Sequence, residues 1–539
     1  MNHKHLRDVA DNLFGKKMPL NSLHQEVADN FYPERANFTI QRSLGTDFAA
    51  NLMSSYPVRC RRDLGNQFST MLRPTARPWF HTRRRFKETE SSEVKVYLEW
   101  FEETQRRAMY DPHSLFVRAT KEGDHDFAAF GQCVLSVEMN KNANGLLYRC
   151  WHLKDVCWQE NEEGIIGFVA RKWKPTMQTL MRTFKNVHPK VIEKCAKTPF
   201  EECEVLHMVA DADMYDGNAN GRPRWSIWYD TTHDHVMEEM PIWGKHYIIP
   251  RWQTVSGSQY SYSPATVCAL PDARLLQAMT FTLLEAGEKA TSPPIIATQN
   301  AVRSDLALYA GGVTWVDEEY DEKLGAALRP LEQDFRGFNY GLQMNADTRQ
   351  MLHSAFFLDA LTLPQRAPEM TAYEVGQRVQ EYIRNALPLF EPMEMEYNAA
   401  VCDETFDIMW RAGGFGSPDT WPRELRGSEI EFTFESPLHD AIEEQKSQKF
   451  QQAQALIGSA MALDPSCAFL PKTEVALRDA LLGAGVPATW LNSEAYVTEQ
   501  KANAQQMAAQ QQKLAAMEQA SNAAKNIGQS GLIPQQAPV

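Results

Sequence analysis

Two histidines separated by one residue, His233 and His235, are the first candidates for metal chemistry in this sequence. On a strand, alternate side chains point to the same face, so both imidazoles would be presented to one ion. No third ligand is identifiable beside them, and a surface strand or turn is the favoured interpretation. A metal-dependent intracellular hydrolase that uses this pair with Asp211 or Asp213 is kept as an alternative function.

The segment DADMYDGNANG, from Asp211 to Gly221, has the composition of a calcium loop. An EF-hand loop follows D-x-[DN]-x-[DN]-G and ends with a bidentate glutamate at position 12. Here Asp216 and Gly217 come one residue late, and position 12 is Arg222. The composition therefore favours a β-hairpin turn over a calcium site.

Motifs of the common catalytic sites are missing from the sequence. It contains no G-x-x-x-x-G-K-[ST] phosphate loop, no H-E-x-x-H and no G-x-S-x-G. We therefore predict a protein that is not an enzyme, with no catalytic residues, no cofactor and no bound metal.

Composition narrows the function classes further. The 539 residues suffice for several packed units, and 69 acidic against 55 basic residues give a net charge of −14. That balance excludes a protein whose whole surface grips nucleic acid. The nine scattered cysteines fit free thiols in a reducing cytoplasm, and the lack of a long apolar run predicts no membrane segment.

One stretch, from Arg59 to Lys87, is strongly basic, with nine Lys or Arg residues and one acid. Trp79, Phe80 and Phe86 are interleaved with the charges, a combination typical of nucleic-acid binding. The alternative, which we favour, is an extended surface segment whose arginines pair with acids of a neighbouring subunit.

The elements that carry these residues are of mixed type. Residues 91–124 predict two helices broken near Asp111-Pro112, and residues 127–250 predict strands separated by Asn, Gly and Asp turns, with one helical insert. The fold class is therefore α+β with a mainly antiparallel sheet.

The helix expected after Pro271 has almost no polar face. Such a helix must be covered on most sides, either in the core of a large monomer or between copies of itself in a ring. We favour the ring, and predict that Leu276, Met279 and Leu283 pack between subunits.

Pro364 and Pro368 bracket a polar tip between two helical segments. Because proline stops a helix, the tip should be rigid and exposed, and Arg366 at its apex is suited to contact phosphate. We predict that this tip faces DNA through Gln365, Arg366 and Glu369.

The order of several segments resembles the portal, or head-to-tail connector, proteins of short-tailed bacteriophages. The segments are LRPTARPWFHTR, LFVRATKEGDHDFAAFGQCVLSVEM, HYIIPRWQTVSGSQYSYSPATVCALPDARLLQAMTFTLLEA and TLPQRAPEMTAYEVGQRVQEYIRNALPLFEPMEMEYN. The likeness covers most of residues 40–412 in order.

The resemblance implies a portal fold with named parts. The expected parts are a wing at 1–261, stem helices at 262–291 and 334–354, a clip at 292–333, a tunnel loop at 355–370, a long wing helix with its connection at 371–440, a helical crown at 441–525 and a disordered tail at 526–539.

The resemblance also implies function. It predicts a dodecameric ring at a unique capsid vertex, through which double-stranded DNA is packaged and ejected, assembled in the bacterial cytoplasm and carried in the virion. The implied partners are the large terminase, a tail adaptor, and capsid and scaffold proteins, without a membrane. The acidic clip would dock basic partner surfaces, unless it is a solvated turn, through Asp317, Glu318, Glu319, Asp321 and Glu322. A structural capsid or tail protein without a channel is a further alternative.

Overall fold

The computed structural model forms two compact units. The first comprises Met1–Trp79, Gln105–Gly414 and Ser436–Leu438, and the second comprises Phe80–Thr104, Phe415–Glu435 and His439–Val539. The residues that the structure describes are 2–43, 45–47, 49, 52–75, 78–85, 91–297, 315, 328–330, 336–361, 393–434, 450, 452–459, 472–483, 486, 490, 492 and 494–529.

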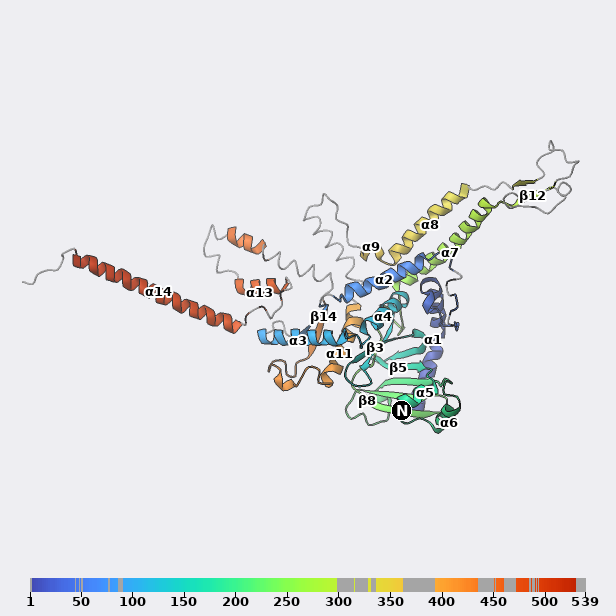
Figure 1. Cartoon of the computed structure of the whole chain (residues 1–539), viewed down its shortest axis with the longest axis horizontal. Coiled ribbons are helices and arrows are strands. Elements are labelled where there is room, and N and C mark those ends of the chain that lie inside the picture. Colours follow the sequence, from blue (N-terminus) through green and yellow to red (C-terminus); the bar gives the residue numbers. More distant parts are fainter. Residues whose placement is uncertain are drawn as a thin grey trace, which may run out of the picture. The chain divides into compact units, whose positions relative to one another are not determined.

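A five-stranded antiparallel sheet with the order β4-β5-β6-β7-β8 forms the centre of the first unit. Its strands are β4 (Val156–Glu160), β5 (Ile166–Trp173), β6 (Val205–Asp211), β7 (Arg224–Asp230) and β8 (His235–Ile242). Helix α1 (His3–Phe31) lies along one face (Figure 1), where Leu6, Ala10 and Leu13 pack on buried strand residues such as Leu206. Helical spacing places these three α1 residues on one side of the helix.

The opposite side of the sheet is covered by the predicted helical insert. Helices α5 (Met177–Thr183) and α6 (Pro189–Lys197) bury Leu180 and Val191 against Val205 and Met237. Because successive strand residues point to opposite faces, Val205 packs under these helices while the next residue faces α1. The prediction of a helical insert within a mainly antiparallel α+β unit is confirmed.

A second sheet has the order β3-β2-β9, with strands β2 (Val134–Met139), β3 (Leu146–Trp151) and β9 (Tyr247–Ile248). Helix α4 (Phe116–Phe130) leads into β2, and α2 (Tyr56–Leu72) packs on α4 through contacts that include Phe68 and Phe127. On this sheet, Tyr148 bonds the hydroxyl of Thr405 in α11 (Ala399–Arg411) at 2.7 Å. A π-helix, Glu394–Asn398, precedes α11.

Two long helices form a hairpin in the first unit. Helix α7 (Pro264–Thr291) and α8 (Arg336–Ala355) lie side by side and lead to the short antiparallel pair β12 (Ile295–Ala297) and β13 (Leu328–Pro330) (Figure 1). With 28 residues α7 is roughly 42 Å long. The short strands β10 (Gln253–Thr254) and β11 (Ser261–Tyr262) precede it, and α9 (Leu358–Leu361) follows α8.

The second unit holds a two-stranded antiparallel sheet of β1 (Phe80–Arg84) and β14 (Ile430–Phe434). Next to it Phe101, in α3 (Ser92–Met109), makes edge contacts with Phe415 and Trp421 at centroid distances of 5.1 and 5.0 Å. Helices α13 (Thr473–Gly483) and α14 (Glu494–Gln529) also belong to this unit.

The predicted break between two helices near Asp111-Pro112 is confirmed, because α3 ends at Met109 and α4 begins at Phe116. Helix α7 begins at Pro264 and continues through Pro271. In the described part of the chain, we find no helix that is both long and apolar enough to cross a membrane.

Candidate functional site: the base of the helical hairpin

The end of α4 and the start of α7 are joined by side-chain hydrogen bonds. Three hydroxyl groups at the entry to α7 donate to carbonyl oxygens that the last turn of α4 leaves without a helical partner. The pairs are Ser261 to Gly131, Ser263 to Ala128 at 2.8 Å, and Thr266 to Ala129 at 2.9 Å. Ser263 also accepts from the Thr266 amide as the N-cap of α7, so one side chain serves both helices.

Gly131 makes this joint sterically feasible. It caps α4 in the left-handed region at φ +72°, and a β-carbon there would lie 2.1 Å from the carbonyl carbon of Tyr262. A side chain is therefore excluded both by the backbone conformation and by the approach of the α7 segment.

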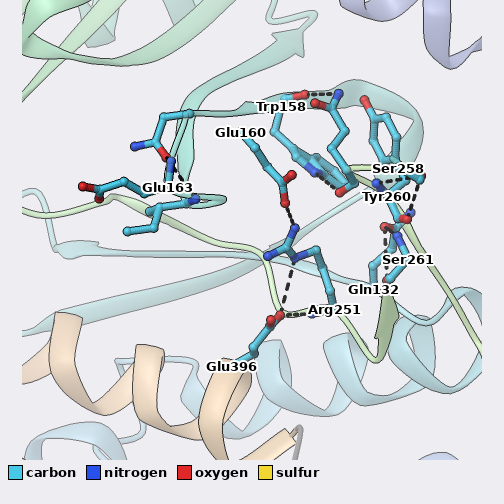
Figure 2. Close-up of polar contacts among 12 residues, drawn as sticks. Gln132, Trp158, Glu160, Glu163, Arg251, Ser258, Tyr260, Ser261 and Glu396 are labelled. Carbon is cyan, nitrogen blue, oxygen red and sulfur yellow. Dashed lines mark hydrogen bonds and ion pairs between the residues drawn. The ribbon is translucent and has the colours of Figure 1, made fainter. Parts of the chain in front are cut away.

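An arginine between two glutamates holds the strand that enters this joint. Figure 2 shows Arg251 with its guanidinium against Glu160, from the end of β4, and Glu396, from the π-helix. The backbone amide of Arg251 also donates to Glu396 at 3.0 Å. The Arg251 side chain is 13% exposed, so solvent screens its charge less than it screens an open surface pair.

The segment between Arg251 and α7 is pinned to the larger sheet. Trp158 donates its indole N–H to the carbonyl of Gln259 at 3.1 Å, and Gln259 donates back to the carbonyl of Trp158 at 2.7 Å. On the other side, the amide of Ser261 donates to Gln132 at 3.0 Å, as Figure 2 shows. The segment therefore has fixed partners before α7 begins.

A buried lysine lies next to the same tryptophan. Lys17 donates to the carbonyls of Leu153 and Val156, both at 2.6 Å, and its ammonium lies 5.0 Å from the ring centroid of Trp158. Burial lowers the pKa of Lys17 to about 8, because the charged form has lost most of its water. The carbonyls and the ring replace part of that solvation.

Further along α7, a glutamine binds the loop before α2. The Gln277 side-chain oxygen accepts from the amides of Met53 and Ser54, both at 2.8 Å, and its nitrogen donates to the Ser54 carbonyl at 2.9 Å. One turn earlier, Arg274 donates to Glu26 of α1 at 2.7 Å. The first half of α7 is thus fixed to two other parts of the unit.

The hairpin leaves large apolar side chains exposed. Helix α7 exposes Phe281 (48%) and Leu284 (54%), and α8 exposes Tyr340 (72%). Of the residues predicted to pack between subunits, Leu276 is fully buried within this chain, whereas Met279 and Leu283 are half-buried. Leu283 approaches Gly341 of α8, where a β-carbon would lie 3.0 Å from its side chain. Their role between subunits stays a prediction.

The predicted docking and tunnel-loop residues lie outside the described part of the chain, so their roles stay predictions. These residues are Asp317, Glu318, Glu319, Asp321, Glu322, Gln365, Arg366 and Glu369.

The basic stretch is not an extended surface segment, because most of its first half forms α2. Arg73, at the end of α2, forms a buried ion pair with Asp124, donates to Asn398 at 2.7 Å and stacks on Tyr397. Burial raises the pKa of Asp124, although Arg73 opposes that shift. In the second unit, Arg83, Arg84 and Arg85 pair with Glu431, Glu424 and Glu429. These arginines bind acids of their own chain.

The structure does not bring together the residues of the alternative hydrolase site. His233 lies in the turn before β8 and bonds Asp230, whereas His235 begins β8 and faces the carbonyl of Asn186. Asp211 pairs with Arg224 at 3.1 Å. The DADMYDGNANG segment connects β6 to β7, which confirms the hairpin interpretation.

Comparison with known proteins identifies the class. A family model described as "Bacteriophage head to tail connecting protein" matches residues 3–491, and the chain belongs to this family. As the description states, proteins of this family connect the head of a bacteriophage to its tail.

Two curated relatives carry a more specific name than the family does, since both are portal proteins. A probable portal protein of Bordetella phage BPP-1 is 24% identical over 435 residues, which cover 77% of this chain and 76% of the relative. The portal protein of Salmonella phage epsilon15 is 22% identical over 320 residues, or 56% of this chain and 55% of the relative. Two solved structures, a gene transfer agent virion and the neck of an empty particle, match with TM-scores of 0.35 and 0.34 at 10% and 11% identity. In both cases the match covers 80% of this chain and 95% of the other.

Proposed function

We propose that the chain is a portal protein whose copies assemble into a ring, a dodecamer in this proposal, around a channel for double-stranded DNA at one capsid vertex. The protein is structural and does not catalyse a reaction in this proposal. Membership of the head-to-tail connecting family and the two portal relatives support it.

The apolar surface of the α7–α8 hairpin is the observation that carries the ring. Exposed apolar surface on a soluble protein often marks an interaction site. Phe281, Leu284 and Tyr340 are each about half exposed or more on these two helices. Covering them with the hairpin of the next subunit would produce a closed ring of stems when the rotation between neighbours closes around an axis.

The remaining parts of the proposal concern partners. The acidic segment between β12 and β13 would dock the large terminase during packaging and a tail adaptor afterwards, because acidic residues attract basic partner surfaces. Arg366 would touch the DNA backbone. Capsid and scaffold proteins would contact the ring at its rim.

Mass measurement in solution and electron microscopy of the purified chain test this function. We expect a discrete assembly close to twelve times the 61.4 kDa chain mass, seen as rings with a central hole of DNA width. A protein that stays monomeric under every assembly condition, including with its scaffold partner, would contradict the proposal. Rings without such a hole would favour a structural capsid or tail protein that has no channel.

A further inference from the structure

Three residues with metal-binding side chains meet at one end of the five-stranded sheet. The register of β6 and β7 pairs Val205 with Asp230, which brings Cys203, two residues before β6, next to the last residue of β7. His233 lies three residues further on, in the turn before β8. Among the residues that the structure describes, these three form a group whose ligand atoms all lie within 4.8 Å of one another.

Their distances approach those of a tetrahedral metal site. Cys203 Sγ lies 3.5 Å from Asp230 Oδ1, and zinc ligands at about 2.3 Å for sulfur and about 2.1 Å for oxygen would be about 3.6 Å apart. His233 Nδ1 lies 2.7 Å from Asp230 Oδ2, closer than two ligands of one ion would lie. A shift of the imidazole by about 1 Å would lengthen the distance between Nδ1 and Oδ2 to that of two ligands of one zinc ion.

The three side chains are buried, and the Asp230 carboxylate is held in place by hydrogen bonds. Cys203 and Asp230 are 3% and 1% exposed, and the His233 side chain is 8% exposed. Asp230 Oδ1 accepts from the backbone amides of Thr232 and His233 at 2.9 and 3.2 Å, which fixes the carboxylate. A metal ligand that is oriented in this way loses little entropy on binding.

We propose that Cys203, Asp230 and His233 bind one zinc ion, or a transition metal of similar preference. A thiolate with an imidazole and a carboxylate is a ligand set that zinc accepts and that magnesium and calcium do not prefer. A thiolate and a carboxylate carry two negative charges, which a divalent ion neutralises in a buried place. The fourth position is left for water.

Metal binding displaces the thiol proton of Cys203 and requires an Nδ1 of His233 that carries no proton. The Cys203 thiol gives up its proton to solvent as the S–Zn bond forms, and His233 binds through Nδ1 with its proton on Nε2. A cysteine thiol is ordinarily protonated at neutral pH, so one proton should be released for each ion bound there.

The metal would join two separate connections of the sheet. Cys203 lies in the segment between α6 and β6, whereas Asp230 ends β7 and His233 lies in the turn before β8. His188, the N-cap of α6, stacks on His233 at a centroid distance of 5.0 Å, so the helical insert also rests on the site. This site differs from the predicted hydrolase site, and it departs from our prediction that the protein binds no metal.

Cobalt(II) is the probe that tests the site, because a thiolate ligand gives it a charge-transfer band in the near ultraviolet. The full chain, stripped of metal and kept reduced without thiols, is titrated with cobalt and then with zinc. We expect one cobalt per chain with a thiolate band, displacement by zinc, release of about one proton per ion and a higher unfolding temperature that a chelator reverses.

Matched variants separate this site from others. Cys203→Ser should abolish the thiolate band and His233→Asn should weaken binding at least tenfold, whereas Cys195→Ser and His235→Asn should bind like the wild type. If Cys203→Ser disturbs folding, as judged by circular dichroism, two other measurements test the site. Asp230→Asn should weaken cobalt binding, and the wild type should release about one proton per ion. A wild-type protein that binds no cobalt at micromolar metal, or a band that survives in Cys203→Ser, overturns the proposal. Neither outcome depends on ring assembly.

Discussion

Gly131 meets Tyr262 so closely that a methyl group on the glycine would lie 2.1 Å from the tyrosine carbonyl carbon. This approach lets the last turn of α4 and the first turn of α7 share hydrogen bonds. Gly131→Ala should therefore cost about 3 kcal/mol of unfolding free energy, from the left-handed backbone and the overlap together. Denaturant unfolding of the purified chain measures it.

Gly257 is the matched control for this change. It also has a positive φ, +89°, but a β-carbon at this position would have no atom within 4 Å. Gly257→Ala should therefore cost only about 1 kcal/mol, from the backbone alone. Equal losses in the two variants would show that the contact with Tyr262 has no role.

Gln277→Leu should release the loop before α2. The substitution leaves two amides and one carbonyl without their partner, at a cost of about 2 kcal/mol, and hydrogen exchange at Met53 and Ser54 should become faster. Gln277→Glu keeps the acceptor for both amides, so their protection should stay near that of the wild type. Fast exchange in both variants would instead show that the loop is held by the bond from the Gln277 amide nitrogen to the Ser54 carbonyl, which both variants lack.

Acid should destabilise the first unit partly through His24. This histidine packs between Phe38 and Phe130, and among the described residues neither ring nitrogen has a hydrogen-bond partner. Burial lowers the pKa of His24 to about 3, so between pH 6.5 and 3 the unfolded chain takes up a proton that the folded chain refuses. Stability is therefore lost as the pH falls, by about 2 kcal/mol between pH 6.5 and 5.

His24→Leu removes that proton uptake. Its unfolding temperature should fall less than that of the wild type between pH 6.5 and 5, and at neutral pH it should match or exceed the wild type because no polar group is buried alone. His113→Leu, at an exposed position, controls for the loss of a histidine. Parallel pH curves for His24→Leu and the wild type would contradict the assignment.

Phe281→Asp should block ring assembly without unfolding the chain. The side chain is 48% exposed, so the monomer tolerates the charge, whereas burial between subunits would not. Phe200→Asp, at a residue that is 76% exposed beyond α6, should still form rings. Leu283→Asp should also prevent assembly, but Leu283 contacts α8 in the same chain, so the monomer would lose stability as well. Regular rings from Phe281→Asp would exclude the hairpin from the interface.

Arg366→Ala should leave rings intact and impair DNA packaging or retention, because the proposed phosphate contact is lost. Arg366→Lys keeps the charge and should retain more packaging. Packaging assays on assembled particles measure both. Failure to form rings would assign Arg366 to subunit packing, and normal packaging by the alanine variant would remove it from the DNA path.

Local patterns predict much of the fold. Alternating apolar residues indicate β2, β3, β5, β6 and β7, and the pattern between β5 and β6 indicates a helical insert. Helix α7 runs through Pro271, although proline often ends a helix. Proline is tolerated there since the carbonyl it leaves unpaired belongs to Val267, which lies on the exposed side of the helix. The sequence Ser263-Pro264, a cap followed by proline, indicates where the helix begins.

Contacts between distant segments cannot be predicted in this way. Arg73 and Asp124 lie 51 residues apart, and only the packing of α2 on α4 joins them. Likewise, the sequence pairs His233 with its neighbour His235, whereas the β6–β7 register brings the distant Cys203 next to Asp230 and His233. Charge and spacing show which groups are available, but the register decides which of them meet.

Apart from a bond between Thr280 and Asn345 inside the hairpin, the described polar contacts that tie α7 to the rest of its unit end at Gln277, although the helix continues to Thr291. Roughly 21 Å of α7 thus extends past its last such attachment. Mechanically, the hairpin behaves as a rod that is fixed at its base and free at its far end. A sideways load on its far tip would act with the greatest bending moment near the base, where the hydroxyl and amide bonds of Ser263, Thr266 and Gln277 would have to resist it.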